Sequence, residues 1–541
     1  MHGDIQAAAA GAGQAVTSEP RRICVVLDKG NLLRWHLWLV DSLRAQYDVF
    51  ALLKADAETV RLPLSCKLAF ELERLIYRIP PGAAIDRIEA EAFKAPVLCG
   101  DDESETFDIA IDCTGASNGV VQAERTLNVL FNGLPGEIGA LAALLDNLSI
   151  CVSIEEVERP GIWVTATPAL ADRRVLIRAI DTACSFAIDL IAKAVRQHPF
   201  QANARVPPSR ARPPSSTAGL AYVVASLAWK ANRFLSLRLA DREQWSVAYR
   251  WIDGDALIVE REAEFTLLAD SGRSYYADPF ILRRGGRTAL FMEEFSFSTM
   301  RGRIAVAFVE KDGSVSQPRP ALEEDHHLSY PQVFESDGEV WMVPESGANS
   351  SIDLYRATDF PFRWRHEATL LEGAAAYDAT LVHDDAGWWM LAATRLGRGT
   401  GWDRLSIFHA RHLLGRWQAC ADNPVVLDAR AARPAGAIIS RFGARLRPVQ
   451  DCGAYYGAAI GLWRIDRLDQ NGFEQTQVAK IASDRFGVHT YNAAYGLEVV
   501  DAFGKTRGRR TATFTCESVP LIGQAANIDR PALSGFKIAP I

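Results

Sequence analysis

The second half of the chain repeats one pattern of apolar and polar positions five times. Each copy is an apolar, strand-like segment, a turn rich in Gly or Asp, and a second strand-like segment rich in Val, Phe, Trp and Met. The starts lie 52, 48, 55 and 56 residues apart, at Asp278, Tyr330, Asp378, Arg433 and His489. A period of about 40–55 residues with several short strands is typical of a β-propeller blade. The pattern therefore predicts an all-β, five-bladed propeller over residues 241–535.

The ends of these strands predict the position of a site. In an antiparallel hairpin, the start of the first strand and the end of the second lie on the same side, so both should surround one mouth of the central channel. Charged groups are seldom buried unless they form ion pairs or take part in binding or catalysis. The polar residues at these positions are Asp278, Glu293, Glu294, Tyr330, Glu345, Asp378, Arg395, Arg433, Gln450, Asp451, His489 and Asn492. Carboxylates and arginines around one opening favour a sugar or polyol site.

Several of these residues also have a structural interpretation. An Asp at the start of a strand can cap a turn, which would explain Asp278 and Asp378. Glu293 and Glu294 are adjacent and point to opposite faces, so at most one faces the channel; Glu294 is the residue assigned to substrate binding. Five tryptophans are expected mainly to pack the blades, although one or two could form a sugar-stacking platform: Trp341, Trp364, Trp388, Trp389 and Trp417.

The basic residues also have both a binding and a structural interpretation. Arg433 precedes a proline, which favours an extended strand start from which a long cation reaches the channel. Arg447 is a further binding candidate, but it could equally pair with Glu345 or Asp451. His489 is assigned to binding, although a lone histidine is often a hydrogen-bonded structural residue.

The propeller segment resembles a known family. The strings YADPFIL, MEEF, HLSYPQVFE, PESGANSSIDLYRATDFPFRW, DATLVHDDAGWW, ARPAG, RPVQDC and HTYN resemble the N-terminal propeller domain of plant glucosamine inositolphosphorylceramide transferases, which also occurs in many bacterial proteins. The resemblance covers roughly residues 240–530. It implies a fold related to the five-bladed propellers of family 43 and family 32 glycoside hydrolases, in which three carboxylates act as base, helper and general acid.

The resemblance implies catalytic roles for three carboxylates here. Asp278 matches the base position, and Glu345 and Asp378 are the candidates for the other two roles. The match is incomplete, because the second repeat begins with Tyr330 where the hydrolases have an Asp. The separate transferase domain of the plant proteins is not found in this chain, so binding of a glycan without cleavage stays open.

The first half predicts a different fold. Strand-like and helix-like segments alternate over residues 21–197, beginning with RRICVVLD and ending with a long amphipathic helix at 173–197. Such alternation predicts an α/β domain with a parallel sheet, whose ligand crevice would lie near residues 113–118. Neither GxGxxG nor GxxxxGK[ST] occurs.

This half, with a strand that ends in DCTG and a terminal helix after the run TATPALADRRVL, resembles a divergent formyltransferase domain. The resemblance implies a fold that transfers a formyl group from a folate to amino groups, using an Asn, a His two residues later and an Asp. Here Asn132 is followed by Leu134 in that position. No catalytic residue is carried over, and formyl or acyl transfer to an amino sugar is kept as an alternative function.

Residues 198–240 are interpreted as a linker rich in Pro, Ser and Arg followed by a connecting helix. The helix carries Lys230, Arg233 and Arg238 and is too short and charged to span a membrane, so it either packs between domains or lies on a membrane surface. The segment QWSVAYRW from Gln244 is predicted to close the propeller as the outer strand of its last blade. Residues 1–20 are predicted to be a disordered tail without a signal sequence.

Composition limits the remaining possibilities. The 541 residues carry a net charge of −7, with Lys and Arg scattered outside the linker, which argues against a nucleic-acid partner. Nine cysteines without CxxC spacing predict buried thiols in a reducing, cytoplasmic setting. His326 and His327 are adjacent and point apart, so no metal site and no cofactor are predicted.

Together these observations predict a carbohydrate-active protein of glycan or glycolipid biosynthesis. The partner would be a sugar, glycan or glycolipid held at the propeller mouth and transferred or cleaved there, with possible contact to a membrane surface. The alternatives are a non-catalytic glycan-binding module and formyl or acyl transfer by the first half.

Overall fold

The computed structural model describes residues 21–55, 62–99, 105–115, 121–159, 163–197, 211–239, 243–252, 262–310, 312–395, 397–441, 443–483, 485–505 and 509–518. The chain divides into two compact units. Unit 1 comprises residues 1–240 with 396–400, and unit 2 comprises residues 241–395 and 401–541. The tail predicted at 1–20 and residues 198–210 of the linker and helix predicted at 198–240 lie outside the described residues.

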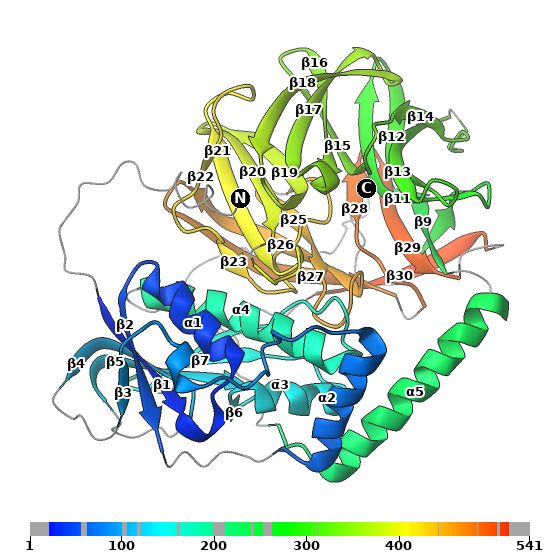
Figure 1. Ribbon diagram of the computed structural model, residues 1–541. Coiled ribbons are helices and arrows are strands. Elements are labelled where there is room, and N and C mark those ends of the chain that lie inside the picture. Colours follow the sequence, from blue (N-terminus) through cyan, green and yellow to red (C-terminus); the bar gives the residue numbers. More distant parts are fainter. Residues whose placement is uncertain are drawn as a thin grey trace. The chain divides into compact units, whose positions relative to one another are not determined.

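Unit 1 contains an eight-stranded sheet with the order β3-β2-β1-β4-β5-β7-β8 and with β6 paired to β5 (Figure 1). Its strands are β1 (Arg22–Asp28), β2 (Asp48–Lys54), β3 (Val97–Cys99), β4 (Thr106–Asp112), β5 (Gln122–Phe131), β6 (Leu134–Pro135), β7 (Val152–Glu156) and β8 (Trp163–Ala166). Its helices are α1 (Arg34–Arg44), α2 (Leu64–Tyr77), α3 (Glu137–Leu145), α4 (Leu176–Arg196) and α5 (Ser216–Leu239). The strand expected at RRICVVLD is present as β1, and the helix expected at 173–197 is present as α4.

The sheet of unit 1 is only partly parallel. The pairs among β3, β2, β1, β4 and β5 are parallel, whereas β5–β7 and β7–β8 are antiparallel. The prediction of a parallel sheet is therefore wrong beyond β5. After β5 the chain reverses through Asn132 and Gly133, whose φ angles of 47° and 74° form a tight turn into β6.

Unit 2 is built from antiparallel sheets around a common centre, which is a propeller-type arrangement (Figure 1). Three sheets follow the chain: β11 to β14, β15 to β18, and β19 to β22 with β23 paired to β21. Their strands are β11 (Ser274–Arg284), β12 (Arg287–Ser296), β13 (Arg301–Val309), β14 (Arg319–Leu322), β15 (Ser329–Ser336), β16 (Glu339–Ser346), β17 (Ser351–Asp359), β18 (Arg363–Glu372), β19 (Ala376–Asp384), β20 (Gly387–Thr394), β21 (Arg404–Ala410), β22 (Gln418–Ala419) and β23 (Val426–Leu427).

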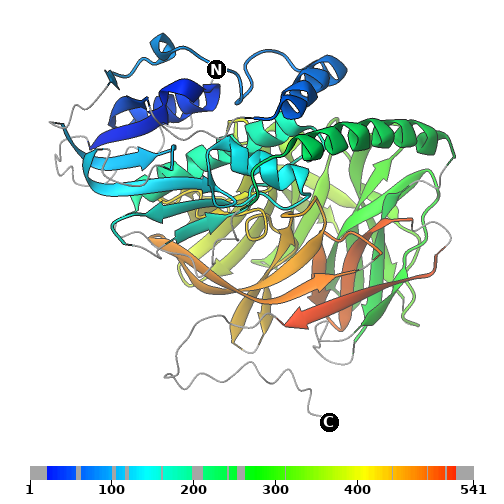
Figure 2. The same ribbon diagram turned by 90° about the horizontal axis from the view of Figure 1, so that it is seen from below.

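The fourth sheet of unit 2 has nine strands in the order β24-β25-β26-β27-β30-β10-β9-β29-β28. These are β9 (Gln244–Trp251), β10 (Ala263–Leu267), β24 (Ile439–Arg441), β25 (Ala444–Asp451), β26 (Ala459–Asp469), β27 (Gly472–Ala482), β28 (Tyr491–Ala494), β29 (Leu497–Gly504) and β30 (Thr511–Ser518). The sheet joins two antiparallel arrays, β24 to β27 and β28-β29-β9-β10, through β30. Its orange and red strands run side by side in both views (Figure 2).

The segment from Gln244, at the start of unit 2, pairs with a strand near the end of unit 2, but it is not an outer strand. β9 pairs with β29 on one side and with β10 on the other. The prediction of an outermost strand is therefore wrong. The reason is β10, a short alternating segment whose buried and exposed residues fit the next place in the sheet.

The tryptophans named from sequence pack between sheets. Trp341 of β16 shares one core cluster with Trp388 of β20 and with Trp417, and all three are buried. Trp389 is buried in the next cluster. Trp364 is half-buried and packs against a further cluster, so all five side chains contribute to packing of the propeller. Eight cysteines of the described residues are free, and seven of them are buried.

Candidate functional site at the channel mouth

Three hairpins of unit 2 share one irregularity. Asp278, Tyr330 and Asp378, the predicted strand starts, have φ angles of 50°, 44° and 52°. At each of them the register of the hairpin shifts, which marks a β-bulge. A positive φ is uncommon for residues other than glycine, above all for a bulky tyrosine, and it persists only where the surroundings fix it. The bulges therefore set the directions of three side chains at equivalent positions.

Asp278 is buried and connects three sheets. Its Oδ1 accepts a hydrogen bond from Thr490 Oγ1 at 2.5 Å, and its Oδ2 accepts one from the Tyr330 backbone N–H at 3.1 Å. Burial raises the pKa of Asp278 to about 6; the His489 imidazole opposes this shift and the Asp501 carboxylate adds to it. Asp278 is thus a carboxyl group that changes protonation near neutral pH.

Glu345 ends the second strand of the next hairpin and lies across from Ser329. Ser329 Oγ donates to Glu345 Oε2 at 2.9 Å, and the Gly347 N–H donates to Oε1 at 2.8 Å. Burial raises the pKa of Glu345 to about 7, and the Asp378 carboxylate contributes to the shift. Both hydrogen bonds favour the ionised form and only partly offset burial.

Asp378 is held by two partners from a later part of the chain. Its Oδ2 accepts a hydrogen bond from Arg433 Nε and another from Gln450 Nε2 at 3.0 Å. Burial would lower the pKa of Arg433, but the Asp378 carboxylate outweighs it and raises that pKa well above its ordinary value. The Arg433 guanidinium carbon lies 5.3 Å from the ring centre of Tyr456 and 5.9 Å from that of Tyr377.

His489 forms a buried pair with Asp501. Its Nδ1 lies against Asp501 Oδ2, and its ring stacks on Trp245 with centres 3.8 Å apart. Burial alone would lower the pKa of His489, but the Asp501 and Asp278 carboxylates raise it above its ordinary value. His489 therefore adds positive charge to an acidic cluster, as expected for a site residue that is also structural.

The same histidine belongs to the one group of described residues whose spacing would suit a metal ion. Asp278, His489 and Asp501 offer ligand atoms within 4.8 Å of one another. Asp501, however, already accepts hydrogen bonds from three backbone N–H groups, those of His489, Thr490 and Asp278, at 2.9–3.2 Å. These bonds favour a role for Asp501 in orienting His489.

Glu293 belongs to the acidic cluster, although the sequence pattern favoured its neighbour Glu294 for substrate binding. It pairs in register with Ala277, just as Glu345 pairs with Ser329. It is buried, and its Oε1 lacks a hydrogen-bond partner among the described residues. His327 Nε2 lies 3.5 Å away, and its Nδ1 accepts the Gly302 N–H, so Nε2 carries the proton of the neutral ring. Burial and the nearby Asp278 and Glu345 carboxylates raise the pKa of Glu293 well above its ordinary value.

A Glu293→Gln variant is expected to be more stable than the wild type at pH 8. Because the pKa of Glu293 is raised in the folded state, the unfolded chain releases this proton first, and stability falls as pH rises above the ordinary glutamate range. A neutral amide removes this penalty. The measurement is urea unfolding at pH 5 and pH 8, and the gain should exceed ~0.5 kcal/mol at pH 8 and shrink at pH 5.

A Glu294→Gln variant serves as the control. Glu294 is adjacent in sequence but bonds to Arg303 and Ser274. It should show no pH-dependent gain. Equal behaviour of the two variants would contradict the assignment of Glu293 to the acidic cluster.

Two predicted binding residues lie outside the cluster. Glu294 accepts hydrogen bonds from Arg303 Nε at 2.9 Å and Ser274 Oγ at 3.1 Å, because adjacent strand residues point to opposite faces. Asp451 forms an ion pair with Lys480 Nζ at 2.9 Å. The structure therefore gives both residues structural partners.

Arg447 is also removed from the carboxylates. Its guanidinium donates to the backbone carbonyls of Ala431 and Ala432 and, at 3.0 Å, to Gln475 Oε1. It pairs with neither Glu345 nor Asp451, the partners considered from sequence. Its role is to fix the loop that leads to Arg433.

Tyr330 and Asn492 connect sheets across the channel. The Tyr330 hydroxyl accepts the Gly436 N–H at 2.6 Å and lies 2.9 Å from Thr380 Oγ1. Asn492 Nδ2 donates to the Pro279 carbonyl at 2.7 Å, and its Oδ1 accepts the Ala437 N–H at 2.8 Å. Both side chains therefore hold segments of different sheets together.

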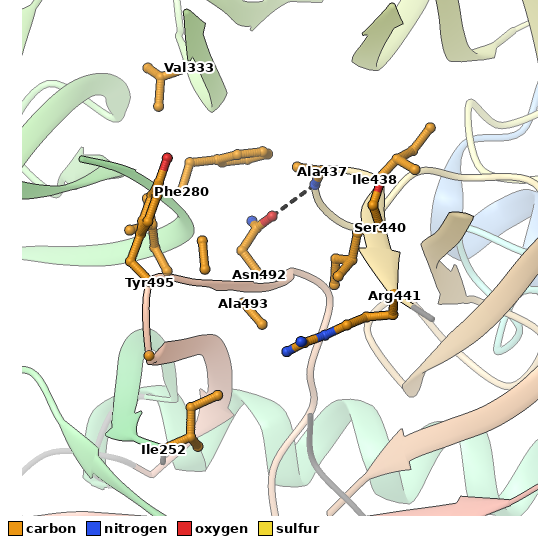
Figure 3. A pocket seen from close by; sticks show the side chains of 14 residues that line it. Ile252, Phe280, Val333, Ala437, Ile438, Ser440, Arg441, Asn492, Ala493 and Tyr495 are labelled. Carbon is orange, nitrogen blue, oxygen red and sulfur yellow. Dashed lines mark hydrogen bonds between the residues drawn. The ribbon is translucent and has the colours of Figure 1, made fainter. Parts of the chain in front are cut away.

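Asn492 also lines a cavity of about 250 Å³, together with residues of the β24–β25 and β28–β29 hairpins (Figure 3). Phe280, Val333 and Tyr495 are among the residues that line it, and Arg441 adds a cation. The carboxylates Asp278, Glu345 and Asp378 do not belong to this lining. The channel therefore has an acidic end and a separate end lined by both apolar and polar residues.

Aromatic side chains missed by the sequence analysis stand beside the acidic end. Trp245, Tyr377, Trp402 and Tyr456 are all partly exposed. Tyr456 lies 4.9 Å from Trp402 and 5.4 Å from the ring of His489, measured between ring centres. Partly exposed rings next to hydrogen-bonding groups are the usual platform for a sugar face. Most of these rings lie outside the repeated hairpins, so the repeat gave no signal for them.

In unit 1, Asn132 has no free amide group. Its Nδ2 donates to the Ser149 carbonyl at 3.0 Å and its Oδ1 accepts the Cys151 N–H at 3.0 Å. Leu134 is fully buried. The described part of the crevice predicted near residue 113 is a turn in which Asp112 Oδ1 accepts the N–H groups of Thr114 and Gly115. The formyltransferase-like assignment stays a prediction.

Comparison with known proteins confirms the resemblance of the propeller segment. Residues 264–500 match the family model described as the N-terminal part of glucosamine inositolphosphorylceramide transferase 1. The protein of that name from Arabidopsis thaliana is 33% identical over 224 residues, which are 40% of this chain and 29% of that protein. The one from Oryza sativa subsp. japonica is 34% identical over 209 residues, 38% of this chain and 28% of that protein. The chain thus spans less than a third of the length of these curated relatives.

Among solved structures, similar chains include an exo-1,5-α-L-arabinanase from a bovine ruminal metagenomic library, with 13% identity and a TM-score of 0.33 over 46% of this chain and 94% of that one. A family 117 glycoside hydrolase from Zobellia galactanivorans has 9% identity and a TM-score of 0.32 over 49% of this chain and 91% of that one.

Proposed function

We propose that this protein is a carbohydrate-active protein of glycan or glycolipid assembly, with the sugar held at the acidic end of a five-bladed propeller. Three separate sheets and the two arrays joined in the nine-stranded sheet support a count of five blades. The match of residues 264–500 to a domain of glucosamine inositolphosphorylceramide transferases supports a sugar or sugar-lipid ligand. The transferase activity in that name belongs to proteins more than three times the matched length, so transfer by this chain is part of the proposal.

The observation that carries the proposal is a set of buried carboxyl groups with separated roles. Asp278, with a pKa raised to about 6, can act as a base, while Glu345, with a pKa raised to about 7, can keep a proton to donate. Asp378 is paired with Arg433 and Gln450, which suits it to orient sugar hydroxyls. Two carboxyl groups of different proton affinity are what chemistry at a glycosidic bond requires.

Activity is expected to have a narrow optimum between about pH 6 and pH 7. It should rise as Asp278 loses its proton near its pKa of about 6 and fall as Glu345 loses its proton near its pKa of about 7. The measurement is product release from aryl glucosaminides and glucosamine-containing glycolipids over pH 4–9. In Glu345→Gln the alkaline limb should be lost together with most of the rate, and an unchanged profile would contradict the assignment.

A second candidate is a glycan-binding module without catalysis. It is favoured by the pairing within the site, since Asp278 and Asp378 are both hydrogen-bonded to protein groups. Calorimetry separates the two functions, because a binder would return the sugar unchanged after long incubation. The cytoplasmic setting stays a prediction under either function.

A further inference from the structure

Six large apolar side chains are exposed on two adjacent helices of unit 1. They are 46–78% exposed: Leu64, Leu68 and Leu75 of α2, and Leu220, Val224 and Leu227 of α5. Thirteen such side chains are exposed among all the described residues, so nearly half of them gather here. These six residues are called the α2–α5 apolar face. Scattered exposed apolar residues need no explanation, but a contiguous group marks an interaction site.

The two helices lie side by side and run in the same direction (Figures 1 and 2). At their beginnings a Cβ on Gly219 would lie 2.5 Å from Ser65 Oγ, and further along Tyr222 Oη donates to Glu73 Oε1 at 2.5 Å. Ser226 and Ile76 then line one small cavity. The contact therefore extends along both helices, from their first turns onward.

The exposed residues of both helices emerge on one side of this contact. With 3.6 residues per turn, Leu64, Leu68 and Leu75 form a stripe about 90° from the α2 surface that touches α5. Leu220, Val224 and Leu227 form a stripe about 110° from the α5 surface that touches α2, turned in the opposite sense. Because the helices are parallel, opposite rotations bring both stripes to the same side. The exposed Glu71 lies one turn from both Leu68 and Leu75 and adds one carboxylate to the α2 stripe.

The α5 part of this face lacks polar side chains. From Leu220 to Ala228, every residue that the structure describes as exposed is Leu, Val or Ala. Helices that face water normally carry charged residues on that side. Between Leu220 and Ala228, one side of α5 packs on α2 and the other presents hydrocarbon.

Charge identifies the partner. Residues 198–240 contain six Lys or Arg and no Asp or Glu, although the whole chain has a net charge of −7. Among the described residues around the helices, Lys67 and Arg212 are exposed, and the exposed acidic residue Glu71 leaves an excess of one positive charge among these three. A surface that offers both hydrocarbon and negative charge is the headgroup layer of an anionic bilayer. No helix in the described part of the chain is long and apolar enough to cross a bilayer.

We propose that the α2–α5 apolar face binds the surface of an anionic lipid bilayer, with its leucine side chains inserted to the level of the headgroups. The surrounding cations would pair with acidic lipids, as in other interfacial amphipathic helices. This inference goes beyond the proposed sugar chemistry and does not depend on it.

The test is co-sedimentation of the full chain with vesicles of phosphatidylcholine alone and with about 30% phosphatidylserine. We expect binding to the anionic vesicles, weaker binding to the neutral ones, and a decrease at about 0.5 M salt, where charges are screened. The double substitution Leu68→Asp/Val224→Asp should reduce partitioning about tenfold or more. The matched control is Met300→Asp/Leu414→Asp, two residues of unit 2 that are 64% and 57% exposed, and it should bind as the wild type does.

Three results would overturn the inference. These are absence of the wild type from the anionic vesicle pellet, equal binding to neutral vesicles, and equal losses in both double variants. A concentration-dependent dimer in light scattering that the Leu68→Asp/Val224→Asp variant abolishes would instead identify the face as a contact between two copies. Circular dichroism of each variant checks that these exposed substitutions leave the fold intact.

Discussion

Asp278→Asn is expected to reduce turnover of a sugar substrate by about 10²–10⁴-fold while leaving the fold intact. The substitution removes the group that accepts a proton near neutral pH. Asparagine tolerates the left-handed backbone at this position as aspartate does, where φ is 50°. Its amide can still accept the Tyr330 N–H and contact the Thr490 hydroxyl. The measurement is the turnover rate at the wild-type optimum together with the thermal unfolding midpoint.

Asp337→Asn is the matched control for this variant. Asp337 also has a positive φ, 52°, but it is exposed in a turn between β15 and β16. The same chemical change there should leave turnover unchanged. Full activity of Asp278→Asn on a sugar that the wild type converts would exclude Asp278 as the base. Lost activity with retained sugar binding would support that role, since it separates chemistry from recognition.

The second large effect concerns the buried ion pair. Arg433→Met should lower the free energy of unfolding by about 3–5 kcal/mol, because it leaves Asp378 buried with Gln450 as its remaining hydrogen-bond partner among the described residues. Combining it with Asp378→Asn should restore part of this loss, since no unpaired charge then remains. The measurement is urea unfolding of the wild type, both single variants and the double variant, followed by tryptophan fluorescence.

The comparison variant for this pair is Arg467→Met. Arg467 pairs with Asp469 in an exposed turn, where solvent screens the charges. Its loss should change stability far less than that of Arg433. Additive effects of Arg433→Met and Asp378→Asn would contradict a direct coupling between the two residues.

Those residues of the acidic end that belong to the repeat could be predicted from sequence. Asp278, Glu345, Asp378, Arg433, Gln450 and His489 lie at repeated strand ends, and hairpin geometry places such ends together. The distance in sequence from the start of each repeat also predicts Glu293 as a site residue. It lies 15 residues after Asp278, as Glu345 lies 15 residues after Tyr330. Strand alternation shows that Glu293 and Glu294 face opposite ways, but the choice between them depends on the bulge, which shifts the register by a residue.

Residues outside the repeat could not be placed in this way. Trp245 reaches His489 because β9, from the start of unit 2, pairs with β29 near its end. The sequence does not predict Asp501 as a site residue. Its role depends on three backbone N–H groups that only the folded structure brings to one carboxylate. Arg447 and Asp451 were assigned to the site from their position, yet they bond to Gln475 and Lys480 of a neighbouring strand.

Alternation and turn chemistry act between near neighbours, so they were sufficient to predict the repeat, its paired strands, the long helix of unit 1 and the polar residues at strand ends. The tertiary structure alone decided which of these side chains meet, the order of β9 and β10, and the change from parallel to antiparallel pairing beyond β5. These features depend on strand pairing across long separations and on bulges that re-aim single residues. The local sequence pattern predicts neither the long-range pairing nor the bulges.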